Sequence, residues 1–189
     1  TLLGGEDVQV PMMHQTETFG YASQDGYQLI SLPYEGNKLS MLIILPDENN
    51  FTQVEEAMSG LDFQNLVSAM SYTQLDLSMP KFKIESSIGL ADQLDAMGMK
   101  DAFIPGIADF SGMDGTHDLY ISAVQHKAFI EVDETGTEAA AATAVVVGIK
   151  SMPNDEPLKV NIDRPFVFMI IDNKTGSVLF LGRVINPAS

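Results

Sequence analysis

The sequence predicts a strand-rich α+β domain, built mostly from antiparallel sheet with three short helices. Two apolar runs of strand length, 27–34 and 39–46, are joined by the turn signal EGNK and predict a hairpin. Helical periodicity is confined to three short windows, at 52–58, 62–70 and 86–97. The chain has 189 residues, 45% of them hydrophobic, which is enough for one sizeable core. We therefore expect a single domain over residues 1–189.

Each expected helix has a start signal. Thr52 followed by Glu55 is a capping-box pattern for the first helix. Asp62 can cap the second helix, and Ser86 or Ser87 can start the third.

Further strands are expected where apolar residues alternate or run together. Pro80 separates two of them, so the segment around it reads as strand, break, strand. The expected strands bring the total to at least eight and include segments 8–10, 75–79, 82–84, 119–134, 158–172 and 176–185.

Composition excludes several classes of partner and site. The formal net charge of −16 argues against nucleic acid and against an anionic membrane surface, because both are bound through basic patches. The apolar runs are too short to span a bilayer. There is no cysteine, hence no disulfide and no thiolate chemistry. The chain begins with Thr1, so we expect a processed, trimmed or partial sequence.

No catalytic, metal or cofactor site emerges from the motifs. The three histidines, His14, His117 and His126, are far apart and lack the spacing of metal ligands. The segment MDGTHD lacks the ligand rhythm of a calcium loop, and neither a phosphate-binding glycine loop nor a G-x-S-x-G turn is present. We therefore expect no enzyme activity, no metal and no cofactor.

One segment, ETGTEAAAATAVVVGIKSMP at 134–153, combines opposite tendencies. Four alanines favour helix, whereas the flanking threonines and valines favour extended chain. Small side chains would let such a strand slide between two existing strands without displacing a packed core, and Gly136 would permit the backbone swing. The alternative is an ordinary helix or a flexible linker. As a strand, the segment would alternate Thr137, Ala139, Ala141 and Thr143 on one face with Glu138, Ala140 and Ala142 on the other.

Several motifs of this chain resemble the serpin family of serine protease inhibitors. The sequence VDETGTEAAAATA is similar to the hinge of the serpin reactive centre loop, and VNIDRPFVFMI (160–170) resembles the family signature that follows the loop. The other similar motifs, in serpin order, are VPMM, LPDE, MPKFKI, MGMKDAF, DFSGM and the C-terminal LFLGRVINP. The resemblance covers the chain from about Val8 to its end. It implies the C-terminal part of a serpin fold, with a reactive centre loop at about 134–157.

The resemblance implies a suicide-type inhibitor of a serine protease. Counting sixteen residues on from the hinge glutamate, Glu134, reaches Lys150, so Lys150–Ser151 would be the bond that is cut. A lysine there suits the acidic specificity pocket of trypsin-like proteases; the runner-up bond is Ile149–Lys150. After cleavage, the loop would insert as a strand in the main sheet. The residues that would form the hinge and inserting strand are Glu134, Gly136, Thr137, Glu138, Ala139, Ala140, Ala141, Ala142 and Thr143.

Two further positions carry over from the family. Lys81 matches the residue that pairs with the hinge glutamate, so Lys81 and Glu134 would form a latch. His126 matches a buried histidine where the sheet strands part, with a structural or gating role. Its family partners lie upstream of this chain.

A whole serpin is about twice this length, so the resemblance implies a missing N-terminal half. We expect it as a second polypeptide or a missing segment; the alternative is a truncated chain that pairs or swaps strands. A non-inhibitory binding or carrier protein with this fold is the second functional hypothesis, and a module that self-associates through edge strands is the third. We expect a secreted or extracellular location, with a cytoplasmic one as the alternative.

Overall fold

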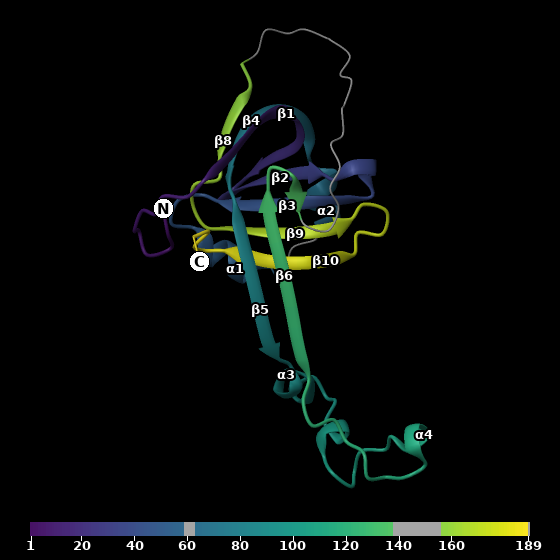
Figure 1. The fold of residues 1–189 in the computed structure, drawn as a ribbon. Helices are drawn as coiled ribbons and strands as arrows, with labels where there is room; N and C mark the ends of the chain where they lie inside the picture. Colours follow the sequence, from purple (N-terminus) through teal and green to yellow (C-terminus); the bar gives the residue numbers. More distant parts are fainter. Residues whose placement is uncertain (59–62, 138–155, 189) are drawn as a thin grey trace. The chain divides into compact units, whose positions relative to one another are not determined.

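Two sheets and four short α-helices form the described part of the chain, residues 1–58, 63–137 and 156–188, in the computed structural model (Figure 1). The chain divides into two compact units. The first contains Thr1–Lys83 and Glu131–Ser189, and the second contains Ile84–Ile130. The single domain expected over 1–189 stays a prediction.

A seven-stranded sheet forms the first unit, in the order β10-β9-β3-β2-β1-β4-β8. All neighbouring strands are antiparallel except β4 and β8, which are parallel. The expectation of a mostly antiparallel α+β fold is confirmed. The strands are β1 (Met12–Gln24), β2 (Tyr27–Pro33), β3 (Leu39–Pro46), β4 (Ser71–Pro80), β8 (Leu158–Asn161), β9 (Phe166–Asp172) and β10 (Val178–Val184).

The predicted hairpin is strands β2 and β3, and the turn signal between them forms a short 3-10 helix at Glu35–Asn37. The hairpin places Leu29 opposite Ile44 and Ile30 opposite Ile43, all fully buried. β3 lies between β2 and β9, so both of its edges are paired, and its residues 40–46 are buried on both faces.

Two helices, α1 (Phe51–Ala57) and α2 (Phe63–Ser68), belong to the first unit. Phe51 and Val54 of α1 pack into one core cluster with residues of β2, β3 and β9. The capping box expected at Thr52 is wrong, because α1 begins at Phe51 and Asn50 holds the N-cap position. The Asn50 side chain donates to the carbonyl of Gly26 instead. The cap expected at Asp62 lies outside the described residues.

The strand expected at 8–10 is wrong, and a longer strand, β1, begins at Met12. The stretch HQTET within β1 is polar on both faces and exposed, so it lacks the alternation of apolar and polar residues that would predict a strand. The run 158–172 is two strands, β8 and β9, rather than one. Arg164, between them, donates from Nε to the carbonyl of Pro46 and holds the connection against the end of β3.

A three-stranded sheet contains β5 (Phe82–Gly89), β6 (Gln125–Asp133) and β7 (Gly136–Thr137), in that order. The strand break at Pro80 is confirmed, since β4 ends there and β5 begins at Phe82. The strand expected from Leu119 begins only at Gln125.

The second unit carries α3 (Ala91–Ala96), a 3-10 turn at Asp101–Phe103, and α4 (Ser111–Asp114). The start expected for the third helix at Ser86 or Ser87 is wrong, because both residues belong to β5. The backbone N–H of Leu90 still donates to the carbonyl of Val124, so sheet-like bonding continues to that residue. The single turn α4 lies outside the three windows of helical periodicity in the sequence.

Candidate functional site

The candidate site is the place where the chain leaves β6 and turns back along it. β6 ends at Asp133, and the two-residue strand β7 pairs with it antiparallel, with Thr137 opposite Val132 and Gly136 opposite Asp133. Gly136 has φ of +118°, a backbone conformation that residues with a Cβ rarely adopt. The expected need for glycine at the hinge therefore has a backbone reason.

Asp133 organises the turn. Its Oδ1 accepts hydrogen bonds from the backbone N–H of Thr135 at 2.7 Å and from Thr135 Oγ1 at 2.5 Å. These bonds stabilise the ionised carboxylate, led by the bond from the Thr135 hydroxyl, so the pKa of Asp133 lies below its ordinary value. The turn is thus held by its own side chains.

Lys81 and Glu134, which the resemblance placed together, form an ion pair between Nζ and Oε2. The bond from Lys81 lowers the pKa of the Glu134 carboxyl, with the Lys81 charge contributing in the same direction. Both side chains are partly exposed, at 38% and 58%, so solvent weakens the attraction. The role of this pair as a latch stays a prediction.

A second ion pair lies beside the first and was not foreseen. Lys83 Nζ on β5 lies 3.7 Å from Glu131 Oε2 on β6. The two lysines are two residues apart, Lys81 directly before β5 and Lys83 within it, and residues at this spacing in extended chain share a face. That spacing in KFK was the available signal, but only the pairing of β5 with β6 shows which acid each lysine meets.

The remaining predicted positions divide into two groups. His126 lies on β6 with an exposed side chain, unlike the buried family histidine that it matches. Thr137 ends the described part of the hinge, in β7. The other loop positions lie outside the described residues: Glu138, Ala139, Ala140, Ala141, Ala142, Thr143, Lys150 and Ser151.

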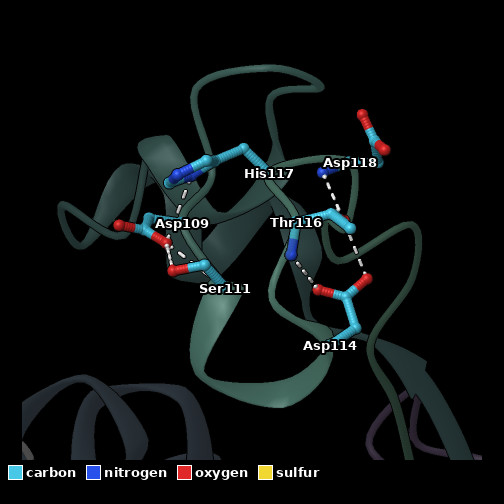
Figure 2. A network of polar contacts seen from close by, with 6 residues as sticks. All are labelled: Asp109, Ser111, Asp114, Thr116, His117 and Asp118. Atoms are coloured by element: carbon cyan, nitrogen blue, oxygen red, sulfur yellow. Dashed lines mark hydrogen bonds and ion pairs between the residues drawn. The ribbon is translucent and has the colours of Figure 1, made fainter.

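A polar network in the second unit lies within residues 109–118, which include the MDGTHD segment (Figure 2). Asp109 Oδ1 accepts bonds from the backbone N–H and the hydroxyl of Ser111, and lies 3.4 Å from His117 Nδ1. Asp114 accepts bonds from the backbone N–H and the hydroxyl of Thr116. These bonds lower the pKa of both carboxyls. The largest cause is the bond from the Ser111 hydroxyl for Asp109, and the bond from the Thr116 backbone N–H for Asp114. Each carboxylate therefore caps its own turn.

Within the described ranges, no three metal-binding side chains gather in one group. In the same part of the chain, no helix has the length and apolar character needed to cross a bilayer.

Comparison with known proteins gives one consistent family. The family model "Serpin (serine protease inhibitor)" matches residues 1–187. An uncharacterized serpin-like protein of Thermococcus kodakarensis is 47% identical over 181 residues, which cover 95% of this chain and 42% of the relative. The leukocyte elastase inhibitor of Xenopus laevis is 42% identical, covering 96% and 49%. Intracellular coagulation inhibitor 2 of Tachypleus tridentatus is 41% identical, covering 93% and 43%.

The solved structures agree with these relatives. Human thyroxine-binding globulin matches with a TM-score of 0.83 and 33% identity, covering 98% of this chain and 49% of that one. This chain spans about half the length of the curated relatives it matches.

Proposed function

We propose that this chain, which belongs to the serpin family, supplies the reactive loop and hinge of a protease inhibitor. The inhibitor acts as a substrate that traps its enzyme, and it has no catalytic activity of its own. The protease attacks the Lys150 carbonyl and forms an acyl-enzyme. The freed loop then inserts beside β6 and distorts the attached protease before the ester is hydrolysed.

The backward turn at Glu134–Gly136 carries this proposal. Because β7 already pairs antiparallel with β6 at two positions, further residues of the loop can extend the same ladder in register. After Glu138, the rest of the inserted strand, residues 139–148, is small or β-branched in sequence, which suits a narrow space between strands.

The free energy for trapping comes from the inhibitor. About ten newly paired residues, at roughly 0.5–1.5 kcal/mol for each net hydrogen bond, supply on the order of 10 kcal/mol. A protease domain is itself stable by about 5–15 kcal/mol. Insertion therefore releases an amount comparable with what distortion of the protease costs.

The partner that completes the protein is proposed to be the N-terminal half of the serpin, as a second polypeptide or a further segment. β10 lies at an edge of the seven-stranded sheet. Leu179 and Leu181 are 52% and 62% exposed, and Val178 and Phe180 are also exposed. An exposed apolar edge strand invites pairing with another strand, and the relatives have as much chain again to provide it. We call the two halves together the complete protein.

The target is proposed to be a trypsin-like serine protease, because of Lys150. One relative is named for a different target, leukocyte elastase, so elastase is the alternative to test. A secreted location finds no support in these relatives, one of which is named as intracellular. A cytoplasmic location therefore stays open.

The test is titration of the complete protein with trypsin and, separately, with elastase. We expect a covalent adduct with trypsin that survives a denaturing gel at a stoichiometry near one to one. Mass spectrometry of the adduct identifies the bond, Lys150–Ser151 or Ile149–Lys150. If both enzymes degrade the protein and neither forms an adduct with it, the proposal is contradicted.

The matched variants are Lys150→Ala and Lys174→Ala. Loss of the lysine at the cut bond removes the trypsin adduct. Lys174 lies exposed between β9 and β10, so its replacement leaves the adduct intact. An undiminished trypsin adduct in Lys150→Ala contradicts the assignment of the bond.

A carrier function is the second candidate, favoured by one cavity. The first unit contains a cavity of about 410 Å³ lined mainly by apolar side chains, with Arg164 and Asp163 among its polar residues. A structural relative, thyroxine-binding globulin, was solved in complex with thyroxine. A carrier would retain a small molecule in native mass spectrometry and would form no protease adduct.

A further inference from the structure

Both ring nitrogens of His14 on β1 contact side chains of the neighbouring strand, β4. Its Nδ1 lies 2.9 Å from Ser78 Oγ, and its Nε2 lies 2.8 Å from Asp76 Oδ1. Thr16 Oγ1 donates to the same carboxylate oxygen at 3.3 Å. The register explains this arrangement, since His14 lies opposite Ser78 and Thr16 opposite Asp76, and residues two apart share one face of a strand.

The two residues that His14 contacts also belong to the part of β4 that carries β8. On the other edge of β4, Asp76 is in register with Lys159, and Ser78 with Asn161. β8 lies at the end of the sheet and pairs with β4 over only four residue positions. The attachment of β8 thus depends on a short segment of β4 that His14 braces from the other side.

We propose that His14, Asp76 and Ser78 form a pH-sensitive clasp, which fastens β1 to the segment of β4 that holds β8. A neutral imidazole can donate one hydrogen bond, to Asp76, while accepting one from the Ser78 hydroxyl. An imidazolium donates from both nitrogens, and its bond to the carboxylate then joins two opposite charges. Histidine is the side chain suited to change charge between about pH 5 and 8.

In the described part of the chain, the register brings two charged side chains to the strands beside His14. β4 presents Asp76, and β8 presents Lys159, in register with that aspartate. The neighbours of His14 on the same face of β1, Met12 and Thr16, carry no charge. Protonation of His14 therefore places a cation next to Asp76, and the clasp becomes stronger as the pH falls towards 5.

The clasp has a consequence for the loop, and this step rests on the proposed function. β8 is the first described strand after the loop, so it anchors the far end of the loop. A stronger clasp at lower pH would hold that anchor more firmly before cleavage. The clasp itself depends only on contacts within the first unit.

Hydrogen exchange of the β4 and β8 amides in the complete protein tests the clasp, measured at pH 5.5 and 8 and corrected for intrinsic exchange. Relative to His14→Gln, the wild type should gain about two- to fivefold protection on acidification, the range of an exposed charge pair. His117→Gln, in the second unit, should respond to pH as the wild type does. Equal pH responses of the wild type and His14→Gln overturn the proposal.

The variant Asp76→Asn provides a second test of the clasp. It keeps a side chain that can accept a hydrogen bond but removes the charge, so the extra protection at pH 5.5 should disappear. A full pH response in Asp76→Asn overturns the proposal. If the wild-type complete protein shows the pH response but does not trap a protease, the proposed function is contradicted and the clasp is still supported.

Discussion

Lys81 and Glu134 form an ion pair between the residue directly before β5 and the turn that follows β6. The pair joins the strand beside the hinge to the hinge itself. Lys83 on β5 and Glu131 on β6 form a second pair close to the first. The contribution of these ion pairs to the hinge region can be tested directly by substitution and by changing the pH.

Reversal of one charge in the first pair should destabilise the complete protein modestly. Glu134→Lys replaces attraction by repulsion, and solvent weakens the interaction because both side chains are partly exposed, so we expect a small loss in the free energy of unfolding. The double variant Lys81→Glu with Glu134→Lys should recover part of that loss. A double variant as unstable as the sum of the two single ones would contradict a direct interaction.

The pair should also respond to acid in a defined direction. The folded-state pKa of Glu134 is lowered by Lys81, so its contribution is present above the unfolded value of about 4.3 and is lost as the pH falls through and below it. The stability difference between wild type and Glu134→Gln should be constant from about pH 7 to 5 and shrink towards pH 3. Denaturant unfolding at each pH measures it. A difference that does not change with pH would exclude the pair as its source.

Gly182 on β10 allows the ring of Phe168 on β9 to lie against the backbone. A Cβ on Gly182 would lie 2.6 Å from Phe168 Cζ, and the Phe168 ring also packs against Phe82, with centroids 5.3 Å apart. Gly182→Ala should therefore destabilise the protein by about 1–3 kcal/mol.

Two further variants check the cause. Gly112→Ala, where an added Cβ meets nothing within 4 Å, should change stability little. Combining Gly182→Ala with Phe168→Leu should cost less than the sum of the single changes, because a smaller side chain relieves the clash. Strict additivity of the two would rule out that clash.

Thr137 is the last described residue of the hinge, and Thr137→Arg should separate cleavage from trapping. A long cation at the start of the inserting strand would have to be buried between strands, which is costly. We expect the variant to be cut by trypsin without forming the stable adduct. Thr18→Arg, on the exposed part of β1, is the control and should trap normally. Undiminished adduct formation by Thr137→Arg would contradict insertion of the hinge.

The strands with strong apolar patterns could be predicted from the sequence, and those with polar patterns could not. β2 and β3 were predicted closely because their apolar runs are buried. β1 was missed because its residues His14 to Thr18 are polar, and their role depends on β4, about 60 residues away in the chain. Ser86 and Ser87 suggested a helix start, but pairing within the sheet keeps them in β5.

The hinge was predicted from composition and resemblance, and its geometry was not. Gly136 and the pairing of Glu134 with Lys81 follow from recognisable motifs. The bonds from Thr135 to Asp133, the second ion pair at Lys83 and the bridging position of His14 all depend on strand register. Register between distant strands is a tertiary property that a local pattern does not contain.

Thermal unfolding before and after cleavage of the complete protein at Lys150–Ser151 tests the central claim most directly. If the loop enters the sheet beside β6, the added strand pairing should raise the melting temperature by about 10 °C or more. The Thr137→Arg variant, cleaved in the same way, should show little of this rise. An unchanged or lower melting temperature after cleavage of the wild type would contradict the account.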